Sequence, residues 1–131
     1  MIFRYTILYV ADVAAALDFY SRAFGLQSGF LHEAGDYGEL DTGGTRLAFS
    51  ARSLMRDLGK DPAPADPDRP VFEIALETDD VPAAFERAVA AGAVPRMAPQ
   101  DQPWGQTISY VACPDGYLIE ICSPVQPPSP G

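Results

Sequence analysis

An internal repeat limits the fold of this chain more than any other feature of its sequence. The segment from Ile7 to Val13 recurs 68 residues later, from Ala75 to Val81. In both copies a strand-like run leads to an aspartate and then to a valine. A solenoid needs at least three repeats, so two copies of a unit this size indicate two modules related by a pseudo-twofold axis.

Each copy leads into a predicted helix. Asp12 and Asp80 are suited to cap the two helix N-termini, because a carboxylate oxygen can accept a hydrogen bond from the first turn. Apolar residues then recur at helical spacing until Gly25 in the first copy and Gly92 in the second. The two helices are therefore expected at equivalent places in the repeat.

Strand-like runs broken by turn residues follow each helix. Turn-forming stretches at 41–44 and 114–116 precede the last run of each copy. The order strand, helix, strand, strand, strand therefore occurs twice. After an opening strand-like run at 2–10, the later runs are expected at 29–32, 38–41 and 45–50, and at 94–97, 106–113 and 117–122.

The chain of 131 residues has the length of one domain, and the repeat divides that domain. We expect module 1 at about 1–50 and module 2 at about 71–124. The linker at about 51–70 is rich in proline and contains a short possible helix around 54–58. The tail at 125–131 is also rich in proline and is expected to be loosely ordered.

Alternation along the strands sorts their side chains onto two faces. Leu8 and Val10 belong to a face that packs on helices. The opposite face is either the lining of a cleft or a solvated surface, and Glu120 favours the cleft because its neighbours along the strand are apolar. This second face gathers the polar and aromatic residues Tyr5, Tyr9, Arg46, Glu73, Glu77 and Glu120.

Charge and composition exclude several classes of partner. Eighteen acidic residues against nine basic residues give a net charge of -9, which repels nucleic-acid phosphates and anionic lipid surfaces. No apolar run is long enough to span a membrane, and no secretory signal is recognised, so we expect a cytoplasmic protein. Cys113 and Cys122 lie in apolar strand-like contexts and are expected to be reduced core residues.

The order and spacing of several short motifs resemble the vicinal oxygen chelate superfamily, which includes glyoxalases, bleomycin-resistance proteins and dioxygenases. The resemblance implies an α+β fold with two tandem βαβββ modules, whose eight strands form an open cup around a ligand. It also implies a homodimer. The motifs are Leu8 to Val13, Asp18-Phe19-Tyr20, Phe24-Gly25-Leu26, Phe72 to Val81, Ala91-Gly92-Ala93 and Pro114 to Glu120.

In metal-dependent members of that superfamily, four side chains project into the cup, mostly His and Glu. The matching positions here are Tyr5, Ala48, Glu73 and Glu120. Alanine has no ligand atom, and a phenol is a poor ligand near neutral pH. The only histidine, His32, lies outside the pattern and is expected at an exposed edge strand. No cofactor is therefore favoured, although Glu73 and Glu120 with water could hold Mg²⁺ or Mn²⁺.

Three hypotheses for function remain open. The first is metal-free binding or sequestration of a small molecule, as in antibiotic-resistance members. The second is an enzyme, a glyoxalase-like lyase or isomerase or a dioxygenase-like member but not a standard lactoylglutathione lyase, with Glu73 and Glu120 as catalytic residues. The third is an accessory or interaction module. Under the first hypothesis the ligand contacts are Tyr5, Tyr9, Arg46, Glu73, Trp104, Tyr110 and Glu120.

Two of these residues also have plainer interpretations. Arg46 could form an ion pair with the glutamates, which would make those carboxylates structural or leave them to position a cationic ligand. The indole of Trp104 could pack in a loop between strands rather than stack on a ligand.

Overall fold

The computed structural model describes residues 1–126 and divides the chain into two compact units. Unit 1 extends from Met1 to Pro64, and unit 2 begins at Ala65. Most of the tail that was predicted to be loosely ordered, residues 127–131, lies outside the described residues. Gln126 is held to unit 2, because its backbone N–H donates a hydrogen bond to the carbonyl of Gly105 at 2.7 Å.

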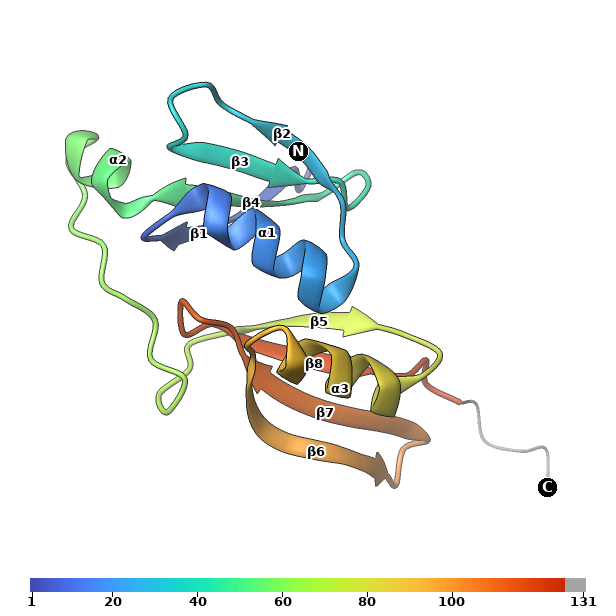
Figure 1. Ribbon diagram of the computed structural model, residues 1–131. Coiled ribbons are helices and arrows are strands. Elements are labelled where there is room, and N and C mark those ends of the chain that lie inside the picture. The colour runs from blue at the N-terminus through green and yellow to red at the C-terminus, as the bar shows by residue number, and fades with distance from the viewer. Residues whose placement is uncertain (127–131) are drawn as a thin grey trace. The chain divides into compact units, whose positions relative to one another are not determined.

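Unit 1 has the predicted strand, helix, strand, strand, strand order, followed by a short helix (Figure 1). Its sheet has the order β1-β4-β3-β2, in which β1 and β4 are parallel and the other pairs are antiparallel. The short helix α2 confirms the one predicted around 54–58. The elements are β1 (Tyr5–Val10), α1 (Val13–Phe24), β2 (Ser28–Leu31), β3 (Tyr37–Leu40), β4 (Arg46–Ala51) and α2 (Arg52–Asp57).

Unit 2 repeats the same topology, with the sheet order β5-β8-β7-β6. The α+β fold with two βαβββ modules is therefore confirmed, each module forming its own four-stranded sheet. Strand β6 continues past its predicted end at Met97 because it lies at the sheet edge, where prolines and register shifts are tolerated. The elements are β5 (Glu73–Glu77), α3 (Val81–Ala90), β6 (Val94–Gln102), β7 (Gln106–Ala112) and β8 (Leu118–Cys122).

Equivalent aspartates begin the two long helices, as predicted. The Asp12 Oδ1 atom accepts a hydrogen bond from the backbone N–H of Ala15 at 3.0 Å, and Asp80 Oδ1 accepts one from Ala83 at 3.1 Å. Each bond satisfies a first-turn donor that has no partner inside the helix. At the other end of α1, Gly25 adopts a left-handed conformation with φ of 72°, which ends the helix.

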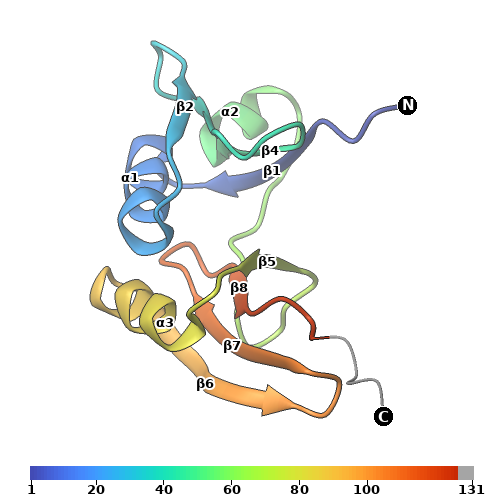
Figure 2. The same cartoon turned by 90° about the vertical axis from the view of Figure 1, so that its right-hand side faces the viewer.

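The helices cover one face of each sheet, on the side predicted from strand alternation. In unit 1 the side chains of Leu8, Val10 and Phe49 face α1 and are at most 1% exposed. In unit 2, Ile119 and Ile121 are buried in the same way against α3. Helix α2 lies on the opposite face of the unit 1 sheet from α1 (Figure 2).

The segment predicted as a linker is held at both ends rather than exposed along its whole length. Helix α2 packs on β1 and β4 of unit 1. On unit 2, an Arg96 Nη2–H donates to the Asp68 carboxylate at 2.6 Å and to the carbonyl of Pro67 at 3.2 Å. Gly116 has a φ of +90°, and a β-carbon there would collide with the carbonyl oxygen of Ala65. Over residues 1–126, no helix is long and apolar enough to span a membrane.

Candidate functional site

The sheet face opposite α3 carries both predicted catalytic residues. Glu120 lies in the middle of this face, because its register partners are Ala75 on β5 and Tyr110 on β7. Glu73 lies two residues before Ala75 on β5, so it is the diagonal neighbour of Glu120 on the same face. The strand register therefore brings three of the predicted site residues together in unit 2.

These three side chains form a hydrogen-bonded cluster. The Tyr110 hydroxyl donates to Glu120 Oε2 at 3.0 Å. The pKa of Glu73 is raised by partial burial, by its hydrogen bond with Glu120 and by the Glu120 charge, and is lowered by a weaker hydrogen bond from Tyr110. The neighbouring Glu120 therefore makes Glu73 easier to protonate than an isolated glutamate. Because Glu73 is exposed, water screens part of this coupling.

The Tyr110 phenol and the Cys122 thiol both stay neutral at this site. Burial, followed by the neighbouring Glu120, raises the pKa of each group. Cys113 and Cys122 are both buried and free, and their burial agrees with the expected core location. The unit 2 face therefore combines two neighbouring carboxyl groups with a neutral donor, and it has no thiolate at Cys122.

The equivalent face of unit 1, opposite α1, contains a carboxylate that the sequence analysis did not single out. Glu39 on β3 pairs with Ala48 on β4, which in turn pairs with Ile7 on β1. The Tyr37 hydroxyl donates to Glu39 Oε2 at 2.8 Å. Alternation within the strand predicted near 38–41 already places Tyr37 and Glu39 on one side, so this signal was available in the sequence.

Two predicted ligand contacts of unit 1, Tyr5 and Arg46, are the first residues of β1 and β4. Tyr5 pairs with Arg46, and its side chain is about half exposed. The Arg46 guanidinium forms an ion pair with Asp41 at 3.0 Å. The predicted pairing of Arg46 with the glutamates is therefore replaced, within unit 1, by a local pair with the aspartate of the preceding turn.

Tyr9 lies at the other end of the unit 1 face, where the chain leaving α2 passes over it. The Lys60 Nζ atom is 3.1 Å from the Tyr9 hydroxyl and 5.3 Å from the centroid of its ring. The Met55 sulfur is 3.5 Å from the same ammonium. Lys60 was not predicted to contact the site, because sequence separation gives no sign that residue 60 approaches residue 9.

The structure does not bring Trp104 to the glutamate cluster. Trp104 lies in the hairpin turn between β6 and β7, where its Nε1–H donates to Gln106 Oε1 at 2.8 Å. Its side chain is 54% exposed. Six residues along the strand direction separate Trp104 from Tyr110, which corresponds to about 20 Å at the usual rise per residue. His32 follows the edge strand β2 and is exposed, as predicted.

The four positions that match the superfamily's metal ligands do not fit a resident metal ion. Ala48 contributes only a methyl group and is fully buried. The Glu120 charge raises the pKa of Glu73, and Tyr110 occupies an oxygen of Glu120. Within residues 1–126, no three His, Cys, Asp or Glu side chains are grouped so as to hold a metal ion. The donor set is therefore incomplete.

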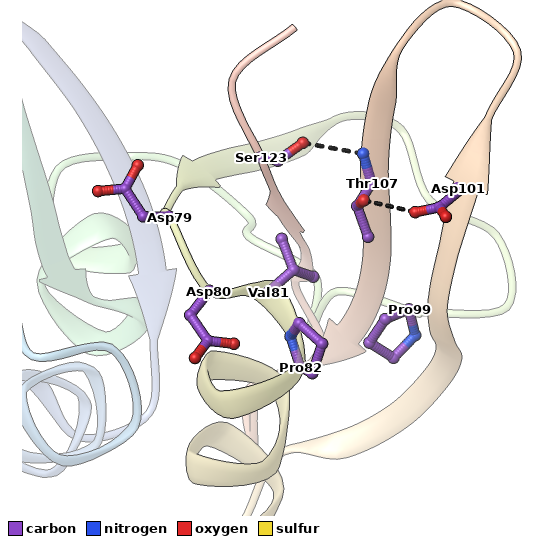
Figure 3. Close-up of a pocket in the computed structure, with 8 residues that line it drawn as sticks. All are labelled: Asp79, Asp80, Val81, Pro82, Pro99, Asp101, Thr107 and Ser123. Carbon is purple, nitrogen blue, oxygen red and sulfur yellow. Dashed lines mark hydrogen bonds between the residues drawn. The ribbon is translucent and has the colours of Figure 1, made fainter. Parts of the chain in front are cut away.

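A separate hollow of about 320 Å³ lies at the N-terminus of α3 in unit 2 (Figure 3). Several of its polar groups bond to one another. The Thr107 hydroxyl donates to Asp101 Oδ1 at 2.6 Å, and the Thr107 N–H donates to Ser123 Oγ at 2.8 Å. None of the predicted site residues lines it; the lining residues are Asp79, Asp80, Val81, Pro82, Pro99, Asp101, Thr107 and Ser123.

Comparison with known proteins identifies the family. Residues 2–121 match the model of the Glyoxalase/Bleomycin resistance protein/Dioxygenase superfamily. An uncharacterized protein of Mycobacterium bovis is 34% identical over 125 residues, which cover 91% of this chain and 81% of that protein. An uncharacterized protein of Mycobacterium tuberculosis is also 34% identical, with 72% of its length covered.

Solved structures agree with this assignment. A glyoxalase-related enzyme from Fulvimarina pelagi has a TM-score of 0.79 and 26% identity, covering 92% of this chain and 86% of that one. TioX from Micromonospora sp. ML1 has a TM-score of 0.70 and 26% identity, covering 92% and 96%. The repeated βαβββ fold and the sequence match lead to one conclusion: the chain belongs to the Glyoxalase/Bleomycin resistance protein/Dioxygenase superfamily.

Proposed function

We propose that this chain binds a small molecule without a resident metal, in the manner of the antibiotic-resistance members of its superfamily. The observation that carries the proposal is the replacement of a metal-ligand set by Ala48, which has no ligand atom, and by a cluster of Tyr110, Glu120 and Glu73. A face that mixes apolar side chains with a few oriented polar groups is typical of ligand-binding sites.

The chemistry of these faces favours neutral or cationic ligands. The net charge of -9 disfavours phosphorylated and other anionic compounds. Tyr5 and Ile7 offer apolar and aromatic surface, while the glutamates and Tyr110 offer hydrogen bonds. We further propose that the protein works as a cytoplasmic homodimer, as the family resemblance implies.

Metal content and ligand binding test this proposal together. The purified protein is incubated with Zn²⁺, Ni²⁺, Mn²⁺ and Mg²⁺ and analysed by mass spectrometry, and a compound library is then screened by thermal shift. We expect substoichiometric metal, and stabilisation by neutral or cationic aromatic compounds that a Glu73→Gln, Glu120→Gln double variant loses.

A Glu33→Gln, Glu86→Gln double variant is the matched control, because it removes the same charge from two exposed carboxylates outside the cluster. Stoichiometric metal in the wild type that disappears in the Glu73 and Glu120 variant, but not in the control, would contradict the metal-free proposal.

A second candidate function is proton transfer next to a carbonyl group, catalysed by the same pair. The raised pKa of Glu73 favours it, because a carboxyl group that titrates closer to neutral pH is a better general acid and base. The Fulvimarina relative is named as a glyoxalase-related enzyme. Deuterium exchange at carbons beside the carbonyl of 2-oxo compounds, followed by NMR, tests this candidate. Exchange that the Glu73→Gln, Glu120→Gln variant does not lower would exclude it.

A further inference from the structure

Each module contains one carboxylate held by a tyrosine hydroxyl on the face opposite its long helix. In unit 2 the pair is Glu120 on β8 with Tyr110 on β7, and in unit 1 it is Glu39 with Tyr37, both on β3. The position in unit 1 that corresponds to Glu120 is Ala48, which is the register partner of Glu39. The carboxylate of unit 1 therefore lies on β3, one strand away in the sheet from the position that matches Glu120.

We propose that Glu39 determines the ligand specificity of the unit 1 face by binding an ammonium or guanidinium group, and that Tyr37 positions its carboxylate. The inference rests on the proposed small-molecule binding and adds to it the charge of the ligand group and the residue that binds it. Glu39 lies outside the set of residues that the sequence indicated.

The orientation of Glu39 is fixed at one oxygen. Tyr37 donates to Oε2 at 2.8 Å, which leaves Oε1 as the oxygen for a ligand. Burial and the neighbouring Glu39 raise the pKa of the Tyr37 phenol, so the hydroxyl remains a neutral donor. A carboxylate that already accepts one hydrogen bond at a defined oxygen offers a directional acceptor to a charged donor.

The surroundings of Glu39 leave its charge uncompensated within unit 1. Arg46 is paired with Asp41, and Lys60 contacts the Tyr9 hydroxyl. No basic side chain of the described residues forms an ion pair with Glu39. A half-buried carboxylate without a counter-ion favours a cationic partner, since a nearby positive charge stabilises its ionised form.

Glu39 also differs from the glutamates of unit 2. In unit 2 the carboxyl groups of Glu73 and Glu120 are neighbours, and the Glu120 charge raises the pKa of Glu73. The hydrogen-bond partner of Glu39 is a phenol rather than a second carboxyl group. Ile7, which follows Ala48 in the same row across the sheet and is 43% exposed, provides apolar surface for the carbon skeleton of an amine.

The test uses three probes of similar shape and different charge: benzylamine, benzyl alcohol and phenylacetate. Binding is followed through the ¹³C-methyl NMR signals of Ala48, beside Glu39, and Ala75, beside Glu120. We expect benzylamine to shift the Ala48 signal, with weaker effects from the alcohol and none from phenylacetate. Glu39→Gln should weaken benzylamine binding at least about tenfold, which corresponds to about 1.4 kcal/mol.

Glu33→Gln is the matched control, because it removes one exposed carboxylate between β2 and β3 without touching this face. Tyr37→Phe keeps the carboxylate and loses its orienting bond, so it should weaken benzylamine binding about threefold while leaving phenylacetate unbound. If Glu39→Gln does not fold, as judged by circular dichroism, Tyr37→Phe alone decides the question by the same shift.

The outcomes separate this inference from the proposed function. Benzylamine binding of wild-type strength in Glu39→Gln, or a shift at Ala75 without one at Ala48, overturns the role of Glu39 and leaves small-molecule binding intact. If neither these probes nor the compound library binds anywhere, the proposed function itself fails and the inference fails with it.

Discussion

The two units share one topology and use it for different chemistry. In unit 2 the face opposite α3 has two neighbouring glutamates beside a neutral phenol, and the Glu120 charge raises the pKa of Glu73. In unit 1 the charges on the face opposite α1 are separated: Arg46 is paired with Asp41, and Glu39 accepts a hydrogen bond from Tyr37. The unit 2 face therefore couples two carboxyl groups to each other, whereas the carboxylate of unit 1 has a phenol as its partner.

This difference shows what the repeat determines. Equivalent strand positions are set by register, so Ala48 and Glu120 each lie at the centre of their sheet. The side chains at these two positions nevertheless differ: Glu120 is half-buried, whereas Ala48 is fully buried. A duplicated fold of this kind can place a functional group on β8 in one unit and on β3 in the other.

The largest expected effects on stability arise in the two cores. At one pair of equivalent positions the buried side chains differ in size, Phe49 in unit 1 and Ile121 in unit 2. Phe49 is fully buried with its ring centroid 4.9 Å from that of Tyr20, and Ile121 is 2% exposed. Phe49→Ala should lower the free energy of unfolding by about 3–5 kcal/mol and Ile121→Val by about 0.5–1.5 kcal/mol, measured by urea denaturation. A loss for Ile121→Val that exceeds its expected range would show that the unit 2 core adapts poorly to the missing methyl group.

The turns that precede the last strand of each unit give the next largest difference. Gly43 and Gly116 have φ values of +96° and +90°, but a β-carbon is unobstructed at Gly43 and collides with the Ala65 carbonyl at Gly116. Gly43→Ala should cost about 1–2 kcal/mol through its backbone conformation alone. Gly116→Ala should cost about 1–3 kcal/mol more, through the collision. Equal losses of thermal stability would mean that residue 65 does not pack on this turn in solution.

The sequence predicted the fold more fully than the site, for a physical reason. Alternation and capping are local patterns, so the strands, both helix caps and the buried face that includes Leu8 and Ile119 could be derived from short segments. The β-strand prediction failed mainly at β6, whose prolines are tolerated at a sheet edge that the sequence does not reveal.

Site contacts depend on which distant side chains meet, and local patterns do not specify this. Register brought Glu73 and Glu120 together, as their shared face suggested, and placed Tyr110 beside Glu120. The approach of Lys60 to Tyr9 depends on the path of the chain after α2, which no periodicity encodes. Trp104 was included for its aromatic character, and its distance from Tyr110 follows from where the hairpin turns.

The coupling between the two glutamates of unit 2 can be tested by removing one partner. Glu120→Gln eliminates a negative charge, so the pKa of Glu73 should fall toward its ordinary value, as measured by ¹³C NMR of the glutamate carboxyl carbons. Tyr110→Phe should move it in the opposite direction, because the Tyr110 hydrogen bond lowers the Glu73 pKa. An unchanged Glu73 titration in Glu120→Gln would mean that burial alone raises this pKa.

The raised pKa of Glu73 also makes the stability of the folded protein depend on pH. A carboxyl group whose pKa is raised on folding binds its proton more tightly in the folded state. Its contribution is fully present below its unfolded pKa and is lost as the pH rises through the higher folded pKa. Glu120→Gln should therefore flatten the decline of stability in this pH range.

The smallest expected effects on stability come from ion pairs on the surface, where both units should lose little. Arg46–Asp41 in unit 1 and Arg96–Asp68 in unit 2 have separations of 3.0 and 2.6 Å, and their aspartate side chains are 56% and 75% exposed. Water and salt screen such pairs, so Asp41→Asn and Asp68→Asn should each cost no more than about 1 kcal/mol. Because Arg96 also donates to the Pro67 carbonyl, it retains one partner in Asp68→Asn, whereas no second acceptor is evident for Arg46 within residues 1–126 of this structure. Urea denaturation at low and high salt should therefore give a slightly larger and more salt-dependent loss of unfolding free energy for Asp41→Asn than for Asp68→Asn. The reverse order would show that the contact with the Asp68 segment contributes more to unit 2 than its exposure suggests.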